Sequence, residues 1–270
     1  MVSNNPVSLS TQNNLSFPKK LWIYTNFDCN LRCSYCVAES SPTASRRALT
    51  PGIIQRLVDE AQTLEFDQIY FTGGEPFLLK EIYDLLEYSS GRVCTTVLTN
   101  AMLFQGKRLE NLCAIKNDNL IVQVSLDGSC PEHHDPYRGR GSWNKTLTGI
   151  RLLQEVGFRV RISTTETPSN SAHLAEICKF HLELGIPEKD HIIRPLAKRG
   201  FSNDGMLVGK HNLSPEITVS VGGVYWHPLS TDPDMQLADQ ILPLSEAICL
   251  VRAELEKLDI ASQAQLCAFK

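Results

Sequence analysis

Three cysteines lie close together in the first part of the sequence. Cys29, Cys33 and Cys36 form a C-x3-C-x2-C spacing, and no fourth Cys or His lies nearby. Thiolates are soft ligands that select zinc, copper(I) or iron–sulfur clusters. Structural zinc sites and ordinary iron–sulfur carriers use four protein ligands, whereas three thiolates on a four-iron cluster leave one iron open to a substrate or cofactor. The spacing alone leaves three alternatives: a cluster, a zinc site completed by a distant ligand, and free thiols on a loop.

A second group of residues with chemical potential comes later in the chain, where Gly73, Gly74, Glu75 and Pro76 follow Thr72. Two glycines allow a backbone to approach a ligand closely. The glutamate offers a carboxylate, and the proline fixes the direction in which the chain leaves. Taken alone, this segment is typical of a plain turn between a strand and a helix.

Both groups come directly after predicted strands. Strands are expected at 20–25, 68–72, 93–99, 120–126, 159–164 and 191–196, and helices at 51–64, 78–88, 104–113, 143–156 and 171–184. Strands that alternate with helices of this length indicate a parallel α/β sheet. Ligands of such sheets bind at the carboxyl ends of the strands, so the cysteines and the glycines are expected on one rim. The pattern itself is compatible with a barrel and with an open, doubly wound sheet.

The pattern changes after residue 200. Residues 201–214 indicate a loop, 217–226 a hairpin with a glycine turn, and 237–258 one or two helices. We therefore expect three parts: an extended or disordered tail over 1–18, the strand–helix domain over 19–200, and a C-terminal appendage over 201–270 that covers it.

Composition limits the classes of function. The 270 residues carry a formal net charge of −4 and no basic runs, which argues against a general nucleic-acid binder. The sequence has no secretory signal and no apolar stretch long enough to cross a membrane, so a cytoplasmic protein without a membrane partner is expected. Nine cysteines cannot all pair internally, and a reducing compartment favours metal-binding or catalytic thiols over disulfides.

The two motifs together resemble the signature of the radical S-adenosylmethionine (SAM) superfamily, over about residues 20–200. The resemblance implies a partial (β/α)6, TIM-like barrel with a small hairpin-plus-helix appendage. It implies that Cys29, Cys33 and Cys36 hold one [4Fe–4S] cluster, with SAM on the fourth iron. The implied activity is reductive cleavage of SAM to methionine and a 5′-deoxyadenosyl radical, which takes hydrogen from an unknown small-molecule or peptide substrate. An external one-electron donor such as flavodoxin or ferredoxin is then required.

The resemblance also assigns SAM contacts. Tyr35 resembles the residue beside the adenine, and the segment Gly73, Gly74, Glu75 and Pro76 resembles the one that holds the methionine amino group. The remaining matches are Thr99 and Asn100 as a polar rim pair, Ser125 and Asp127 near the carboxylate and ribose, Arg138 for the carboxylate, and Thr164 and Leu196 for ribose and adenine. In addition, Arg194 in the sixth strand is placed where it could point toward an anionic substrate.

Within the superfamily, the sequence looks most like the branch of the molybdenum-cofactor cyclase and the SPASM and twitch enzymes. Members of that branch often carry an auxiliary cluster with a cysteine after a hairpin. Here Trp226 and His227 stand at that point, and no remaining pair of cysteines has a C-x-x-C spacing. The auxiliary site therefore looks lost, and a remnant site from His227, Cys249 and Cys267 is the minor alternative.

Two functions of other classes remain open from the sequence. One is an iron–sulfur electron-transfer or redox-sensing protein that does not turn over SAM, and the other is a structural zinc protein. The segment from Gly73 to Pro76 favours the radical SAM enzyme, because neither rival needs a second motif on the rim.

Overall fold

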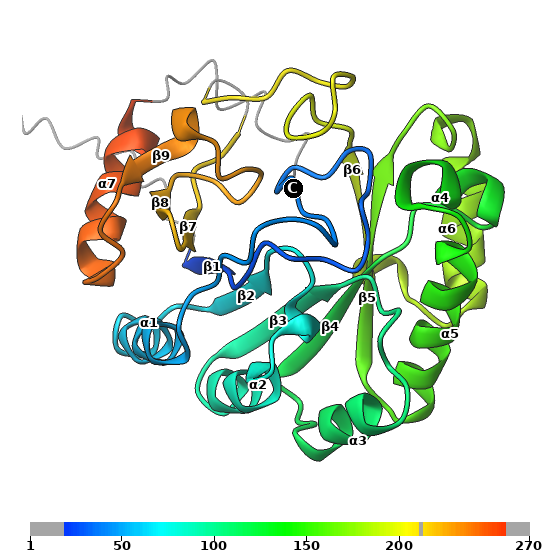
Figure 1. Cartoon of the computed structure of the whole chain (residues 1–270), viewed down its shortest axis with the longest axis horizontal. Coiled ribbons are helices and arrows are strands. Elements are labelled where there is room, and N and C mark those ends of the chain that lie inside the picture. The colour runs from blue at the N-terminus through cyan, green and yellow to red at the C-terminus, as the bar shows by residue number, and fades with distance from the viewer. Residues whose placement is uncertain (1–18, 211–212, 258–270) are drawn as a thin grey trace, which may run out of the picture.

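The main feature of the fold is one sheet of nine strands, in the order β6-β5-β4-β3-β2-β1-β7-β8-β9. The computed structural model describes residues 19–210 and 213–257. All neighbouring pairs from β1 to β6 are parallel. The sheet is curved, and helices cover its outer side (Figure 1). This arrangement confirms the predicted α/β fold with a partial barrel.

The barrel strands are β1 (Lys20–Tyr24), β2 (Gln68–Thr72), β3 (Cys94–Thr99), β4 (Leu120–Ser125), β5 (Arg159–Glu166) and β6 (His191–Pro195). The helices between them are α1 (Pro51–Thr63), α2 (Ile82–Ser90), α3 (Lys107–Ala114), α4 (Pro131–Arg138), α5 (Ser142–Glu155) and α6 (Leu174–Glu183). Short 3-10 turns lie at Pro76–Leu78, Ser171–His173, Glu188–Asp190 and Pro233–Met235.

Helix α1 shows how local sequence defines these elements. The side chain of Thr50 accepts a hydrogen bond from the backbone N–H of Ile53 at 3.4 Å, and Pro51 occupies the first turn. The first N–H groups of a helix have no acceptor within the helix, and the threonine side chain accepts from one of them. Proline has no N–H, so in the first turn it removes no hydrogen bond. The buried residues then recur at helical spacing: Ile54, Leu57, Val58 and Ala61.

Helix α4 was not among the predicted helices. It has only eight residues, and Pro136 lies inside it. Proline removes a hydrogen-bond donor from a helix and is normally a signal for its end. The helix matters for the site because its last residue, Arg138, is buried beneath the rim.

Alternate residues of each strand face opposite sides of the sheet. On β1, Leu21 and Ile23 belong to the main hydrophobic core under the helices, whereas Lys20, Trp22 and Tyr24 line the inner face of the barrel. The inner face is therefore polar and aromatic, while the outer face is aliphatic. A barrel with such an interior leaves space for ligands on its inner side.

The C-terminal part continues the same sheet beyond β1. Its elements are β7 (Ile217–Ser220), β8 (Gly223–Tyr225), β9 (Gln236–Ala238) and α7 (Leu244–Glu256). β7 pairs in parallel with β1, with Leu21 opposite Ile217, and β8 and β9 follow as antiparallel neighbours. The hairpin prediction is confirmed, and the division of the chain at residue 200 stays a prediction.

Strand β9 lies at the start of the region 237–258, where one or two helices were expected, so the prediction is wrong before Pro243, whereas α7 confirms it after that residue. β9 has three residues and pairs with β8, with Gln236 opposite Tyr225. A strand this short shows no period-2 pattern, and only its partner defines it. The helix begins after Pro243 instead.

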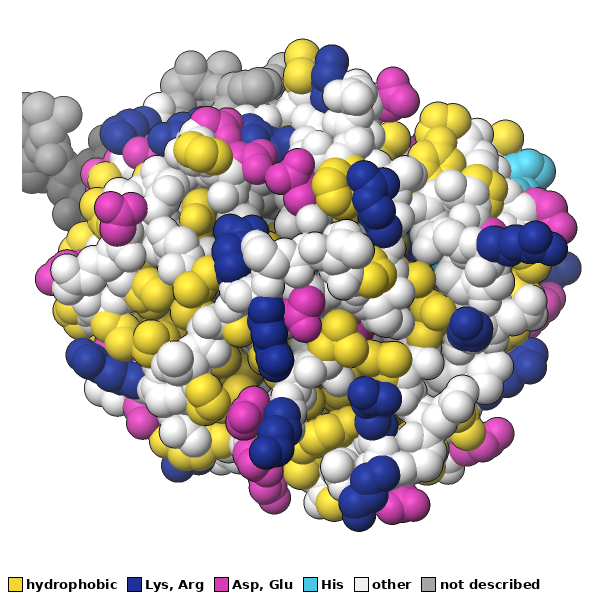
Figure 2. Space-filling view, in the orientation of Figure 1, with side chains coloured by type: hydrophobic (Ala, Val, Ile, Leu, Met, Phe, Trp, Pro, Cys, Tyr) yellow, Lys and Arg dark blue, Asp and Glu magenta, His cyan; other side chains and the backbone are white. Residues whose placement is uncertain are grey.

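The surface is mixed in charge where Figure 2 shows it. Lys and Arg side chains are interspersed with Asp and Glu across that face, with hydrophobic side chains between them. Within residues 19–210 and 213–257, no helix has the length and apolarity that a bilayer crossing requires.

Candidate active site

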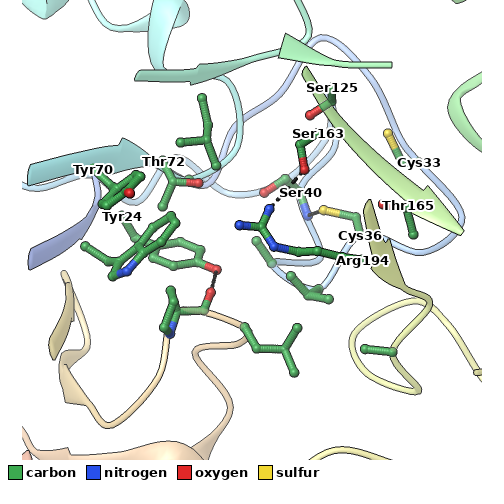
Figure 3. Close-up of a pocket in the computed structure, with 18 of the residues that line it drawn as sticks. Tyr24, Cys33, Cys36, Ser40, Tyr70, Thr72, Ser125, Ser163, Thr165 and Arg194 are labelled. Atoms are coloured by element: carbon green, nitrogen blue, oxygen red, sulfur yellow. Dashed lines mark hydrogen bonds between the residues drawn. The ribbon is translucent and has the colours of Figure 1, made fainter. Parts of the chain in front are cut away.

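A cavity of about 780 Å³ opens on the inner side of the barrel, at the carboxyl ends of the strands. Its wall contains both sequence motifs, Cys29, Cys33 and Cys36 from the loop after β1 and Gly73, Gly74 and Glu75 from the turn after β2. Cys33 and Cys36 lie on one side of it and Tyr24 and Tyr70 on the other (Figure 3). The expectation that the two motifs share one rim is met.

The turn after β2 holds the start of the cysteine loop by main-chain hydrogen bonds. The N–H of Gly74 donates to the carbonyl of Asn26 at 2.8 Å, and the N–H of Glu75 donates to the carbonyl of Asp28 at 2.9 Å. A Cβ on Gly74 would lie 2.1 Å from the Asp28 oxygen. The glycine is therefore required because the protein's own backbone, directly before Cys29, lies against it.

The other end of the cysteine loop is held by two further segments. The N–H of Ser34 donates to the carbonyl of Tyr137 in α4 at 2.8 Å. Gly200, at a φ of +58°, would place a Cβ 2.2 Å from the Cys36 carbonyl, and the N–H of Phe201 donates to that carbonyl at 3.2 Å. Three distant parts of the chain thus fix the backbone that carries the thiols.

The three thiols are suited to a metal cluster. All are free of disulfides. Burial raises the pKa of Cys29 to about 12 and that of Cys33 to about 11, although Arg138 opposes the shift at Cys33. Bare thiolates are thus disfavoured here, and a bound cation would stabilise them. Among residues 19–210 and 213–257, no three His, Cys, Asp or Glu side chains converge on a single ion. A four-iron cluster instead takes each thiolate at a separate corner.

Glu75 is a buried carboxylate on the cavity wall, with an exposed fraction of 1%. It accepts hydrogen bonds from the Thr99 hydroxyl at 2.8 Å, the Asn100 N–H at 2.9 Å and the Phe77 N–H at 3.2 Å. Burial raises its pKa to about 7, and these hydrogen bonds partly oppose the shift. A carboxylate in this state gains from a cationic group placed beside it.

The rim pair Thr99 and Asn100 connects this carboxylate to the cysteine loop. Besides the contacts to Glu75, the side-chain amide of Asn100 donates to the side-chain oxygen of Asn30 at 2.8 Å. Asn30 directly follows Cys29. The pair therefore positions both motifs, and both of its residues line the cavity.

Arg138 and Asp127, which are buried, form a hydrogen-bonded cluster with Tyr35 of the cysteine loop. The Nε of Arg138 donates to the Asp127 carboxylate and to the Tyr35 hydroxyl, each at 2.7 Å, and the Tyr35 hydroxyl also contacts Asp127. The backbone N–H of Thr165 donates to the other Asp127 oxygen at 2.9 Å. The positive charge of Arg138 is thus compensated inside the protein.

Most of the predicted site residues lie on the cavity wall. The exceptions are Pro76, Asp127 and Thr164, and the wall includes the three cysteines, Tyr35, Gly73, Gly74, Glu75, Thr99, Asn100, Ser125, Arg138 and Leu196. Pro76 is buried at the start of a 3-10 turn. Asp127 is turned toward Arg138 rather than toward the cavity.

The assignment of Thr164 to the cavity needs correction. Its hydroxyl donates to the carbonyl of Leu126 at 2.7 Å, and its neighbours Ser163 and Thr165 line the cavity instead. Ile162, two residues earlier, belongs to the core under the helices. Residues two apart on a strand share a face, so Thr164 faces the helices.

Several residues of the wall were not predicted. Trp22 and Tyr70 stack with ring centroids 3.9 Å apart, and Glu216 accepts from the Trp22 indole at 2.5 Å. The alternation of β1 and β2 was the signal that could have found both rings. His227 also lines the cavity, whereas Cys249 is exposed and Cys267 lies outside the described residues.

Two curated proteins are similar to this chain in sequence. An AdoMet-dependent heme synthase of Oleidesulfovibrio alaskensis is 31% identical over 160 residues, which are 58% of this chain and 40% of that protein. The antilisterial bacteriocin subtilosin biosynthesis protein AlbA of Bacillus subtilis is 32% identical over 193 residues, which are 68% of this chain and 41% of that protein. The chain therefore spans about two fifths of the length of these relatives.

A solved structure, anSMEcpe with bound AdoMet and a Cp18Cys peptide, is similar in fold. The TM-score is 0.62 at 16% identity, covering 91% of this chain and 81% of that one. The family model of the radical SAM superfamily matches residues 23–179, a range that contains both motifs, the end of β1 and the whole of β2 to β5. This chain belongs to the radical SAM superfamily, whose members use a [4Fe–4S] cluster and SAM.

Proposed function

We propose that the chain is a radical SAM enzyme that holds one [4Fe–4S] cluster with Cys29, Cys33 and Cys36 and binds SAM beside it. When bound and reduced, the cluster supplies the electron that cleaves SAM into methionine and a 5′-deoxyadenosyl radical, which takes hydrogen from a substrate. The observation that carries the proposal is the shared cavity, in which the backbone of Gly74 and Glu75 is bonded to the segment before Cys29.

The chain's own residues have distinct tasks in this proposal. The buried carboxylate of Glu75 accepts the ammonium of the SAM methionine, in a charge-assisted hydrogen bond worth about 1.5–3 kcal/mol. The Arg138–Asp127 pair holds Tyr35 and so supports the loop that carries Cys36.

The finer assignment is the predicted one, a relative of the molybdenum-cofactor cyclase and of the SPASM and twitch enzymes that lacks the auxiliary-cluster cysteines. The similarity to a bacteriocin biosynthesis protein over 68% of the chain supports a peptide substrate. A peptide or a small molecule is the proposed substrate, and flavodoxin or ferredoxin the proposed electron donor.

The test is anaerobic reconstitution of the protein followed by incubation with SAM and dithionite. We expect about four irons and four sulfides per chain, a SAM-dependent change in the cluster's electron paramagnetic resonance spectrum, and formation of 5′-deoxyadenosine. Cys33→Ala should abolish cluster binding. Cys94→Ala is the matched control, because Cys94 lies within β3 and outside the cavity wall.

Three outcomes would contradict parts of the proposal. A cluster that forms without any effect of SAM would support the electron-transfer alternative. A single zinc ion in place of iron would support the structural alternative. About eight irons would instead contradict the assignment of one cluster.

A further inference from the structure

Arg194 of β6 points into the cavity without a charged partner. Figure 3 shows its side chain reaching from the strand toward the middle of the pocket, next to Ser163. Its Nη1 donates to the Ser163 hydroxyl at 2.9 Å. Among residues 19–210 and 213–257, Arg194 forms no ion pair, and this is its one side-chain hydrogen bond. A guanidinium has five donors, so most of its hydrogen-bonding capacity faces the cavity.

The neighbouring cations differ from Arg194 in this respect. Each of them has a carboxylate partner: Arg138 has Asp127, Arg161 has Asp190, Arg199 has Asp232 and Asp234, and Lys20 has Glu216. Within the part of the chain that the structure describes, the cations around the cavity are thus neutralised one by one, and Arg194 is the guanidinium left without a carboxylate on the wall. Burial of a cation is costly unless the cation is paired with an anion. An anionic ligand would supply the partner that Arg194 lacks.

Glu216 is the carboxylate whose charge reaches Arg194 across the cavity. Burial lowers the pKa of Arg194, and Glu216 opposes that effect. Its own oxygens, however, accept from Lys20 at 3.1 Å and from Trp22 at 2.5 Å. Glu216 is therefore held by the β1 wall and does not complete the coordination of Arg194.

The carboxylate of SAM is a poor match for Arg194. In the proposed site, Glu75 after β2 holds the methionine ammonium, and the methionine carboxylate is attached to the same carbon atom. Glu75 follows β2 and Arg194 lies in β6, and β3, β4 and β5 lie between these two strands in the sheet. The charge of Arg138 reaches Glu75, whereas the charge of Arg194 reaches His227, which follows β8 and lines the same cavity.

The surface near Arg194 is suited to a small apolar body. The stacked rings of Trp22 and Tyr70 lie in the same cavity, together with the hydroxyls of Ser163 and Thr165. The whole volume of about 780 Å³ is within the range of roughly 300–1,000 Å³ that holds one drug-sized ligand.

We propose that Arg194 binds a carboxylate of the substrate and so orients an attached apolar group between β6 and the Trp22–Tyr70 pair, toward the bound SAM. This inference rests on the proposed function, because the bound carboxylate belongs to the substrate of that reaction. The binding preference that it predicts can be measured without SAM cleavage. Arg194 is then a specificity-determining residue, and the substrates of this protein are carboxylic acids or residues that carry a carboxylate.

The test uses two matched pairs of probes on reconstituted protein with SAM present, followed by ligand-observed NMR titration. One pair is 3-phenylpropionate and 3-phenylpropanamide. The other is the N-acetyl, N-methylamide derivative of glutamate and that of glutamine. We expect the acid of at least one pair to bind about tenfold or more tightly than its amide. A preference in the first pair assigns a small acid, and one in the second pair a peptide side chain.

Variants connect that preference to one side chain. Arg194→Gln should remove the difference between acid and amide, and Arg194→Lys should restore part of it, because it keeps the charge without the planar fork. Lys198→Gln is the control, since Lys198 is an exposed cation four residues further along, and it should behave like the wild type.

Two results would overturn the inference. One is equal binding of acid and amide in both pairs by the wild-type protein, a result that does not depend on any variant folding. The other is a loss of SAM affinity in Arg194→Gln as large as the loss of acid binding, which would assign Arg194 to the carboxylate of SAM. Absence of SAM cleavage would refute the proposed function alone, because the binding preference is measured independently.

Discussion

Gly74 lies so close to Asp28 that a Cβ on the glycine would be 2.1 Å from the Asp28 carbonyl oxygen and 2.7 Å from its carbon. The N–H of Glu75 donates to the same carbonyl at 2.9 Å. The turn after β2 and the segment before Cys29 are thus one packed unit. The position of the first thiol depends on a residue forty-five positions away in the sequence.

Gly74→Ala should therefore disturb the cysteine loop. The obstacle is backbone rather than a flexible side chain, so the loop has to shift, at a cost of about 1–3 kcal/mol. We expect lower iron content after reconstitution and a lower free energy of unfolding in urea. Gly52→Ala in α1 is the control, because a Cβ there meets nothing within 4 Å, and it should be neutral or stabilising by up to about 1 kcal/mol. Unchanged iron content in Gly74→Ala would show that the two segments move independently.

Glu75 should make SAM binding depend on pH. Its pKa is raised to about 7 by burial, so the carboxylate that accepts the ammonium is formed only as the pH rises through that value. SAM affinity, measured by calorimetry, should increase from about pH 6 to about pH 7.5, below the ordinary α-amino pKa of roughly 7.7–8.0 at which the ammonium is lost. The sign for folding is opposite, because a raised carboxyl pKa contributes stability at low pH that is lost as the pH rises through about 7.

Glu75→Gln separates this effect from others. It keeps the shape of the side chain but has no charge, so affinity should fall about tenfold or more and should no longer depend on pH over this range. The cluster spectrum should remain, since the thiols are untouched. A wild-type affinity that does not change with pH, or a pH dependence that survives in Glu75→Gln, would remove Glu75 from the proposed SAM site.

The strand–helix alternation, and the position of both motifs on one rim of the sheet, were predictable because short stretches of sequence determine them. The runs of β-branched residues define β1 to β6, and motifs that directly follow parallel strands must meet at one edge. The approximate positions of the thiols and of Glu75 followed without any knowledge of packing. Thr164 was misplaced although the alternation along β5 could have placed it. Val160 and Ile162 belong to the core under the helices, and Thr164 shares their face of the strand.

Other features depend on tertiary partners and could not be predicted. Strand β9 exists because β8 pairs with it, and α4 is a short helix with a proline inside it. The pairing of Arg138 with Asp127 is also of this kind, because the resemblance assigned both residues to SAM. Whether a polar side chain contacts the ligand or a second polar side chain depends on side-chain geometry. Residue spacing in the sequence does not specify that geometry.

The Arg138–Asp127 pair gives the last prediction, on stability. Arg138→Met leaves a fully buried carboxylate without its cation, which typically costs about 3–5 kcal/mol. Asp127→Asn combined with Arg138→Met removes both charges and should cost less than the sum of the two single changes. Urea unfolding of the cluster-free protein at neutral pH measures this coupling. Additive effects would mean that the two side chains do not stabilise each other.

The same pair sets a pH dependence with a defined sign. Burial alone would raise the pKa of Asp127, but Arg138, His134 and the Tyr35 hydroxyl outweigh it and hold the pKa below its usual value. A lowered carboxyl pKa contributes stability above the ordinary aspartate pKa of about 3.9, and this contribution is lost as the pH falls below it. The wild-type free energy of unfolding should therefore decline in acid more steeply than that of Asp127→Asn. Asp118→Asn, at an exposed position, should follow the wild-type curve, and a wild-type curve that runs parallel to that of Asp127→Asn would contradict the ion pair.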